Sequence, residues 1–503
     1  DERFFMYFED IDFCKRAKEI GIKTIYFPSE KIEHLGGKSI GDKRKQKSDY
    51  YKSQDHYFRK HHGIIAALVV KFLRKLFKKK MYKLLVFLAF YTPLQIALNP
   101  GEGVDLASLR ILILALFFIW LAEGLRKRKI LIKNGSQTGL IVSFLCICLI
   151  SLVATQNADW AIRKLLFLFS VFPVYFVASA LLSSREKILK VTKAALLGGT
   201  TVAAIGIMQF LSQFFFGLER VYRFWAENVI VLFLGKTFSQ AVLKNPSWLV
   251  NISGKNYLRA TATFPDPHML SFFLGMLIPA ALALFLIDKR KVVYGTTFVI
   301  LLACDVMTFS RGGYLGLFSG IAFTIFYYWK VMEGKYRIFL LGMAGVFILA
   351  LLIPNPFSAR YLSSFDLKEG SNKGRIETWK QALVVIEEKP IIGSGIGNYS
   401  LEIRPTADYR DPIYAHNTYL DIAAETGIPN ALIWIGILIS SIVALIKISK
   451  KDILFAAFAA GIVIFSVHSL VETAIYSPAV LTLLILMISF SNLEIRSSPR
   501  YKS

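Results

Sequence analysis

Long blocks of apolar residues, separated by short polar connections, occupy the chain from about residue 84 to about residue 495. Most blocks approach the length at which a helix crosses the ~30 Å hydrocarbon core of a bilayer, about 20 residues. The pattern therefore predicts an all-α polytopic membrane protein with about twelve transmembrane helices. The first two predicted spans are short, and a tight hairpin is the alternative structure for them. The predicted spans lie near 84–99, 106–122, 137–154, 165–182, 188–211, 268–287, 292–309, 313–329, 338–353, 429–446, 453–470 and 479–493.

The residues before these blocks follow a different pattern. Residues 1–62 are polar and charged, without a single period. Residues 63–83 combine apolar positions at helical spacing with many lysines, which is typical of a basic amphipathic helix lying along the anionic inner leaflet of a membrane. We therefore expect a polar region at 1–62, a juxtamembrane helix at 63–83, a membrane domain at 84–495 and a cytoplasmic tail at 496–503. Because the chain starts at Asp1 and shows no signal peptide, we expect it to be a piece of a longer protein.

The composition supports this class and changes the meaning of the charge. Hydrophobic residues make up 54% of the chain and charged residues 19%, against about 25% charged residues in soluble proteins. The net charge of +25 would indicate nucleic-acid binding in a soluble protein. Here the lysines and arginines are concentrated in residues 1–83, in alternate connections and in the tail, and the other short connections hold only Arg163, Lys164 and Arg311. The positive-inside rule then places both termini in the cytoplasm, with membrane lipids rather than nucleic acid as partners of the basic side.

This topology leaves two long connections on the outer side, at 212–267 and 354–428. Long loops inside a compact domain usually carry function. In the second loop, Arg375 falls in the first turn of a predicted amphipathic helix at 375–388, where a cation is electrostatically unfavourable. Such a local conflict can mark a site, and a solvated arginine is the alternative.

His416 is predicted to open a short helix that ends at Gly427, close to the outer membrane surface. The positive end of that helix favours the neutral imidazole, which can accept a proton. His416 is therefore a candidate general base. A capping or interface histidine is the alternative.

Two more arginines are expected at the same level. Arg311 lies at the outer interface between two spans, beside Gly312 and Gly313, where the backbone can approach a ligand; snorkelling is the alternative. Arg259 lies near the end of the first outer loop, and a stiff turn into the next span is the alternative. Arginine forks match phosphate oxygens, and the sequence offers no metal-binding spacing there. We therefore expect a site without metal or cofactor, in which arginines stabilise a pyrophosphate leaving group while a base deprotonates a hydroxyl.

Three segments at these positions resemble the bacterial O-antigen ligase and O-antigen polymerase family. They are residues 310–315, the stretch from Gly374-Arg375 to Gly395, and His416-Asn417 followed by Gly427. Order, spacing and topology resemble that family across residues 84–495. The resemblance implies a GT-C-like fold with a large periplasmic loop in the bacterial inner membrane. It also implies metal-independent, inverting transfer of glycan from undecaprenyl pyrophosphate to an acceptor hydroxyl on the periplasmic side, with lipid A-core, a growing glycan or a protein as acceptor.

The resemblance also implies roles for single residues. Arg311 and Arg375 would engage the pyrophosphate, and His416 would act as the catalytic base. The substrate-binding positions expected around them are Arg259, Trp379, Asn417 and Tyr419. Asn430 stands where ligases usually have Gly, Thr or Tyr, so ligase, polymerase and protein O-oligosaccharyltransferase all stay open.

The N-terminal block resembles the C-terminal end of a family-2 glycosyltransferase of the rhamnosyltransferase kind, a small α/β remnant. Residues 1–16 and 34–39 carry the resemblance. It implies that Asp10 corresponds to the catalytic base and that His34 helps to bind the metal of the nucleotide sugar. The nucleotide-binding βαβ half is absent, so we expect residues 1–62 to be inactive alone. A genuine fusion and an artificial join of two sequences are both open explanations.

Two other functions compete with a membrane transferase. A transporter or flippase of lipid-linked glycans should place polar residues at mid-membrane, whereas the predicted spans are nearly free of charge at their centres. A cytoplasmic glycosyltransferase that is merely anchored does not need about twelve spans. Asp305, His468 and Glu472 fall towards the outer ends of spans. We interpret His468 and Glu472, one helical turn apart, as a mutually satisfied pair.

Overall fold

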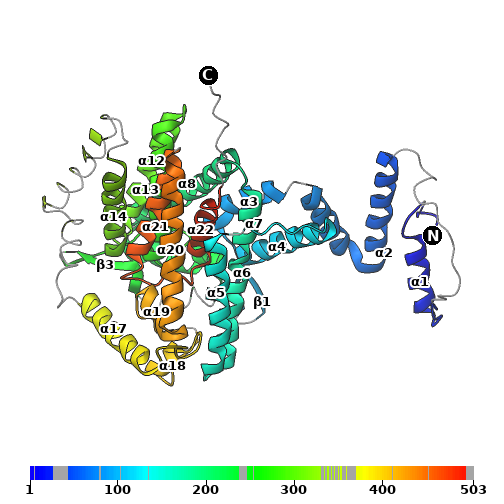
Figure 1. Ribbon diagram of the computed structural model, residues 1–503. Coiled ribbons are helices and arrows are strands. Elements are labelled where there is room, and N and C mark those ends of the chain that lie inside the picture. The colour runs from blue at the N-terminus through cyan, green and yellow to red at the C-terminus, as the bar shows by residue number, and fades with distance from the viewer. Residues whose placement is uncertain are drawn as a thin grey trace. The chain divides into compact units, whose positions relative to one another are not determined.

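The computed structural model describes most of the chain, and its described part is mostly helical (Figure 1). It divides into two compact units, Asp1–Leu84 and Leu85–Ser503. The expected class, a mostly helical polytopic membrane protein, agrees with the apolar helices of the second unit. The described residues are 1–4, 6–25, 43–78, 81–101, 104–133, 135–236, 239, 246–252, 254–329, 370–409, 412–450 and 452–493, with isolated residues between 334 and 358.

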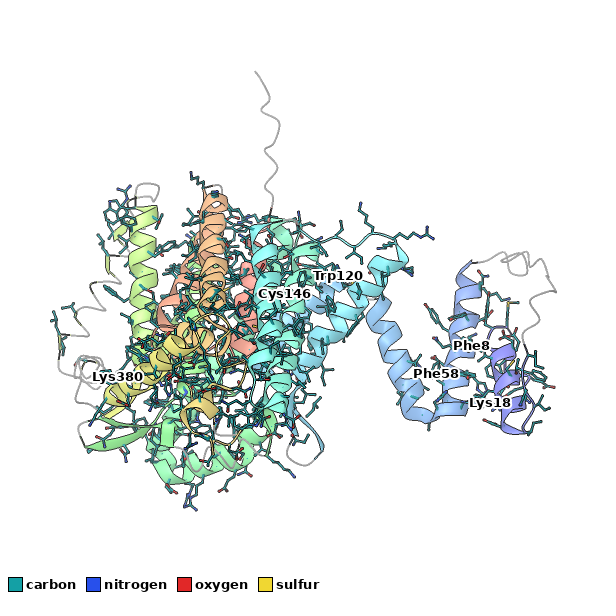
Figure 2. The ribbon with its side chains drawn as sticks, turned by 60° about the horizontal axis from the view of Figure 1, so that its bottom comes forward. Phe8, Lys18, Phe58, Trp120, Cys146 and Lys380 are labelled. Carbon is teal, nitrogen blue, oxygen red and sulfur yellow. The ribbon has the colours of Figure 1, made fainter. Side chains whose placement is uncertain are left out.

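The first unit contains two described helices, α1 (Glu9–Glu19) and α2 (Lys43–Lys78), and α2 is kinked at Gly63. Their aromatic side chains meet: the ring of Phe8 lies 5.4 Å from that of Tyr50 (Figure 2). Residues 1–25 and 43–62, the described part of the expected α/β remnant, contain helix and no strand. Asp10 is exposed on α1, and His34 lies outside the described residues.

The first predicted span, 84–99, differs from the structure in its second half. Helix α3 (Met81–Tyr91) passes into a 3-10 turn, η1 (Thr92–Leu94), where Pro93 cannot continue the helix. The chain then forms an antiparallel hairpin of β1 (Ala97–Gly101) and β2 (Val104–Ala107), with Ala97 opposite Ala107. This hairpin leads directly into α4 (Ser108–Arg126).

Helices occupy the other predicted spans, except that 338–353 lies mostly outside the described residues. Six of the described helical stretches are long and apolar enough to cross a membrane, and Met81–Leu94, Ile453–His468 and Pro478–Phe490 are shorter apolar helices. The count of about twelve spans therefore stays a prediction. The helices are α5 (Ser136–Ile150) with η2 (Ser151–Ala154), α6 (Ala158–Val171), α7 (Pro173–Leu181), α8 (Arg185–Phe216), α12 (Pro267–Ile287), α13 (Lys291–Met307), α14 (Arg311–Tyr328), α20 (Ile428–Ser449), α21 (Ile453–His468) and α22 (Pro478–Phe490).

Helices α12 and α21 form the centre of the second unit. α12 packs against α8, α13 and α21, and α21 also packs against α14 and α20. Small residues allow these close approaches, as is usual where lipid is the solvent. A Cβ added to Gly461 of α21 would lie 2.7 Å from the carbonyl oxygen of Met276 on α12. The bundle therefore holds the start of α12, the start of α14 and the end of α21 close together.

The first outer connection is itself folded. It contains α9 (Leu218–Phe224), η3 (Trp225–Val229), α10 (Ile230–Leu234), η4 (Pro246–Trp248) and the hairpin of β3 (Leu249–Ile252) with β4 (Lys255–Leu258). Trp225, Trp248 and Leu258 are buried in its small apolar core. This core fixes the end of β4, from which Arg259 follows directly.

The second outer connection contributes α17 (Gly370–Glu388), α18 (Tyr399–Ile403) and α19 (Thr418–Thr426), which lie at one end of the bundle (Figure 1). Helix α17 begins five residues earlier than predicted, because nothing in 370–374 stops a helix. Arg375 therefore lies in the second turn, and the expectation of an unfavourable first-turn cation was wrong. The predicted start of this loop near 354 falls among residues that are not described.

Candidate active site

The carboxylate of Glu472 brings residues of the connection 354–428 together with the start of α12. Glu472 lies between α21 and α22 and is 8% exposed. Its Oε1 is 2.7 Å from Nδ1 of His416, and its Oε2 accepts a hydrogen bond from Arg375 at 3.3 Å. Nε2 of His268, in the first turn of α12, lies 3.9 Å from the same Oε2. The carboxylate thus gathers three basic groups from separate parts of the chain.

His416 has the geometry of an oriented base. It precedes α19 with a φ of 50°, a left-handed conformation that is uncommon for a side-chain-bearing residue and is often found at functional sites. Its side chain is 46% exposed. Because the Nδ1–H donates to Glu472, the hydrogen-bond pattern assigns the lone pair to Nε2. That nitrogen can take a proton from a group in front of the site.

The electrostatics at His416 differ from the expectation. Burial alone would lower the pKa of His416, but the hydrogen bond and the charge of Glu472 outweigh it and raise that pKa above its ordinary value. The positive end of α19 was expected to favour the neutral imidazole; the nearby carboxylate reverses that preference. Burial likewise opposes the charged form of Glu472, but His268, His416 and Arg375 together hold the pKa of this carboxyl well below its usual range.

The segment that carries His416 is tied down on both sides. Asp421 accepts a hydrogen bond from the backbone N–H of Ala415 at 2.8 Å and is also bonded by the hydroxyl of Thr473. Thr418 donates its backbone N–H to the carbonyl of Ser469 and its hydroxyl to the carbonyl of Glu472. Hydrogen bonds therefore hold the irregular segments 415–418 and 469–473 against each other. These bonds fix the position of His416 relative to Glu472.

Helix α17 positions Arg375 beside this pair. The guanidinium side chain is 16% exposed. The hydroxyl of Thr378, one turn further along α17, is 3.3 Å from the carbonyl oxygen of Ala415. Arg375 and His416 are thus fixed relative to each other through α17 and through Glu472. A guanidinium binds anions through the N–H groups along its edges, and Glu472 holds that of Arg375 in place.

Arg311 begins α14 and is 8% exposed. The preceding Ser310 caps the helix, and its Oγ lies 2.9 Å from Nδ1 of His268 and 3.3 Å from Nε2 of His468. Phe309, just before them, has a φ of 50°. Two polar contacts, Ser310–His268 and His268–Glu472, therefore connect the start of α14 to Glu472, and a third connects Glu472 to His416.

The glycines beside Arg311 have a different role from the expected one. A Cβ on Gly312 would lie 2.5 Å from the ring of His468, and a Cβ on Gly313 would lie 1.9 Å from Oγ of Ser271. Both glycines therefore leave space for side chains of the protein itself, His468 and Ser271. They permit α14 to approach α12 and α21, and they do not open the backbone to a ligand.

Arg259 is 4% exposed and bonded within the protein. Its Nε donates to the carbonyl of Thr308 at 2.7 Å and one terminal nitrogen to the carbonyl of Ser247 at 3.1 Å. The other terminal nitrogen is 3.5 Å from Nε2 of His268. Arg259 thus braces the turn between α13 and α14 that presents Arg311.

The remaining predicted substrate-binding residues surround α17 and α19. Asn417 caps α19 with its carbonyl oxygen and donates its amide to the carbonyl of Leu470. The hydroxyl of Tyr419 donates to the carbonyl of Ser466 at 2.8 Å. Both side chains therefore use their polar atoms inside the protein. The indole N–H of Trp379 is buried without a hydrogen-bond partner among the described residues.

His468 and Glu472 do not form the expected pair. Helix α21 ends at His468, so the two residues are not one turn apart on a helix. The imidazole of His468 instead stacks on Phe272, with ring centroids 3.6 Å apart. Glu472 is a candidate site residue that the sequence analysis did not predict, although an acid in a short connection between apolar spans is itself a signal of function.

Asn430, the position that departs from the ligase pattern, lies away from this cluster. It is 0% exposed on α20, and its amide donates to the hydroxyl of Thr426 and to Sγ of Cys148 on α5. Its role is therefore to pack α20 against α5. Among the described residues, no group of three or more His, Cys, Asp or Glu side chains is placed to hold a metal ion.

Fold and site together define a polytopic membrane protein with a glutamate, a histidine and arginines gathered at the ends of its helices. Residues 296–435 match the sequence model of the O-antigen ligase family. This match contains Arg311, Arg375 and His416, and it supports the O-antigen ligase family and a membrane glycan-transferring function. No curated protein matches the chain. The match does not extend to residues 1–62, where the resemblance to a family-2 glycosyltransferase stays a prediction.

Proposed function

We propose that the chain is a metal-independent, inverting membrane glycosyltransferase of the O-antigen ligase kind. It moves glycan from undecaprenyl pyrophosphate to an acceptor hydroxyl at the periplasmic face of the bacterial inner membrane. The observation that supports this reaction best is the contact of Glu472 with both His416 and Arg375. One buried carboxylate then orients a base and an anion-binding group toward the same space.

In this proposal Nε2 of His416 removes the proton of the acceptor hydroxyl as that oxygen attacks the anomeric carbon. The bond from the anomeric carbon to the pyrophosphate oxygen breaks, and the lipid pyrophosphate leaves with the electron pair on the opposite face of the sugar. Glu472 stabilises the imidazolium that forms, as the carboxylate does in a Ser-His-Asp triad. Arg375 and Arg311 stabilise the charge that develops on the pyrophosphate.

Arg259 and His268 act in this scheme as supports. Arg259 holds the turn before Arg311, and His268 connects Ser310 to Glu472. Their substitution is therefore expected to weaken transfer by displacing Arg311 and Glu472. Asn417 and Tyr419 similarly hold the backbone on which His416 is presented.

Reconstitution tests the proposal. The full chain in nanodiscs is supplied with undecaprenyl-pyrophosphate glycan and with candidate acceptors, and new glycosidic bonds are measured by mass spectrometry. One transfer per acceptor indicates a ligase or a protein O-oligosaccharyltransferase, and a ladder of products indicates a polymerase. Movement of the lipid-linked glycan across the bilayer without any new glycosidic bond would instead support the transporter.

A further inference from the structure

A pocket of about 240 Å³ lies next to the candidate active site but contains none of its residues. Its walls are the β1–β2 hairpin with the start of α4, the end of α10, residue 167 of α6, and the segments 263–265 and 476–479. Two of these walls continue the backbone of the active site, because 263–265 follows Arg259 and 476–479 follows Glu472. The pocket is therefore formed by the same elements that position the catalytic groups.

Gln95 is the strongest sign of a ligand in this pocket. It lines the pocket and is 7% exposed, and its Oε1 is buried without a hydrogen-bond partner among the described residues. Buried amide oxygens in folded proteins are nearly always satisfied, because desolvation without a partner is costly. A hydrogen-bond donor on a ligand would satisfy this oxygen.

Arg110 also lines this pocket and is held in place by its neighbours. Its Nε donates to Oγ of Ser170 at 2.7 Å, and the guanidinium lies 5.3 Å from the ring centroid of Phe167. Within the described part of the chain, its two terminal nitrogens have no hydrogen-bond partner. The residue is the third of α4, in a first helical turn that disfavours a cation. A residue that lines the pocket thus keeps two unused donor nitrogens, in a helical position where a cation is unfavourable.

Asp105 adds an acceptor to the same pocket. Asp105 lines the pocket, and its carboxylate lies against Gly235. A Cβ on Gly235, which has a φ of 94°, would lie only 2.1 Å from Oδ1 of Asp105, so only glycine leaves room for this carboxylate. Aromatic side chains, Phe167, Phe264 and Tyr476, supply the apolar part of the lining. The pocket thus combines two acceptors, two fixed donors and ring faces.

This combination of donors, acceptors and aromatic rings in one pocket favours a sugar as the ligand. Hydroxyl groups both donate and accept, so the hydroxyls of one sugar can bond both Gln95 and Arg110, while the C–H face of a pyranose packs on aromatic rings. A phosphate would meet the oxygens of Gln95 and Asp105, which repel it. The volume is below the ~300–1,000 Å³ of pockets for drug-sized ligands, which suits one ring. We propose that this pocket binds a single sugar residue of the reacting glycan, an assignment that rests on the proposed function.

Binding is tested on the full chain in nanodiscs with methyl glycosides of hexoses, 6-deoxyhexoses and 2-acetamido sugars, by saturation-transfer NMR. We expect at least one glycoside to bind the unaltered protein, and Gln95→Leu and Arg110→Met to weaken that binding about tenfold or more. The matched control Arg126→Met, at the exposed far end of α4, leaves binding unchanged. If Arg110→Met unfolds, glycoside binding is measured instead for Asp105→Asn, which keeps the shape of the side chain.

Three outcomes would overturn the assignment. No glycoside of the set binds; or binding persists in both Gln95→Leu and Arg110→Met; or inorganic pyrophosphate displaces the glycoside, which would make the pocket an anion site. These measurements need no transfer activity, so a failure of the proposed function, seen as no transfer by the unaltered protein, stays distinguishable.

Kinetics then connect the pocket to the reaction. In a transfer assay, Gln95→Leu should raise the KM for the donor or the acceptor about tenfold and change kcat less than about twofold, because only binding contacts are lost. A variant that has lost glycoside binding while both KM values stay unchanged would contradict the assignment to the reacting glycan.

Discussion

Two buried carboxylates in this protein have nearly the same surroundings and different consequences. Asp12 of the first unit contacts Arg16, Lys60 and His61 at 2.9, 2.8 and 2.6 Å, and Glu472 of the second contacts His416, Arg375 and His268. Each carboxylate thus has at least one histidine and further basic groups around it. Burial opposes the charge of Asp12, and its partners outweigh that effect, so the pKa of Asp12 is held well below its usual range, as is that of Glu472.

The difference lies in the histidine. The side chain of His61 is 6% exposed, whereas that of His416 is 46% exposed. All partners of Asp12 lie on α1 and α2, and they tie these helices together. Glu472 instead holds a base that faces outward from a left-handed backbone. We therefore choose the candidate catalytic site by the accessible nitrogen that the cluster holds, and not by the ion-pair cluster alone.

The largest expected effect comes from the accessible histidine. His416→Gln removes the proposed base, and we expect the transfer rate to fall by about 10²–10⁴-fold with little change in unfolding temperature. His61→Gln, the matching change in the first unit, should leave the rate unchanged. Rates are measured with saturating donor and acceptor in nanodiscs, and unfolding by intrinsic fluorescence. Normal transfer by the His416 variant would exclude it as the base.

The next effect concerns the carboxylate that orients the base. Glu472→Gln should slow transfer about 10–100-fold, because His416 and Arg375 lose a charged partner. The base works in its neutral form, so the rate rises with pH through the pKa of His416. Glu472 raises that pKa, and its removal should shift the rising limb of the pH–rate profile to lower pH.

A matched control for this variant is Glu402→Gln. Glu402 is a part-buried carboxylate on α18 that pairs with Lys389 and Gln156, away from the site. We expect its pH–rate profile to match that of the unaltered protein. A Glu472→Gln profile that also stayed in place would show that the carboxylate does not act through His416.

A smaller effect, confined to stability, is expected for Asp12→Asn. Loss of the charged hydrogen bonds should destabilise the packing of α1 on α2 by about 1.5–3 kcal/mol, seen as faster hydrogen exchange in α1, while transfer is unchanged. Since the pKa of Asp12 is depressed, its contribution is fully present above the unfolded pKa of about 3.9 and is lost as pH falls further. The exposed neighbour Asp10→Asn should change neither; equal exchange in both variants would refute the role of Asp12.

The smallest change to the protein is a single cysteine, which tests on which side of the membrane the Asp12 cluster and the Glu472 cluster lie. Lys18 and Lys380 are exposed on α1 and α17 (Figure 2). In a background with the native cysteines replaced, Lys380→Cys should react with an impermeant maleimide in cells whose outer membrane is opened. Lys18→Cys should react only after the inner membrane is also permeabilised. Labelling in the reverse order would invert the proposed topology.

Local sequence patterns predicted most helices well. They failed where the structure depends on contacts between residues that are far apart in the sequence. Apolar blocks are sufficient to place α4, α5, α8 and α12, because lipid demands helices of that length. The β1–β2 hairpin was missed because Ile96, Ala97 and Leu98 are apolar and extend the predicted span 84–99, although Pro93 already stops the helix.

Sequence motifs gave Arg311, Arg375 and His416 as candidates, and the structure places Glu472 in contact with the last two. Its two hydrogen-bonded partners are 56 and 97 residues away along the chain, a separation that no helical or strand period reveals. The same contact explains the error about His416, since a carboxylate at hydrogen-bond distance outweighs a helix end.

The interlocking of residues 415–418 with 469–473 limits how this protein can be re-engineered. The matched segment, 296–435, is not a transplantable module, because Glu472 and His268 lie outside it. A chimera that exchanges only 296–435 with a relative would pair a foreign histidine with a native glutamate. Swaps meant to change glycan preference should therefore carry 259–268 and 466–476 along with the central segment.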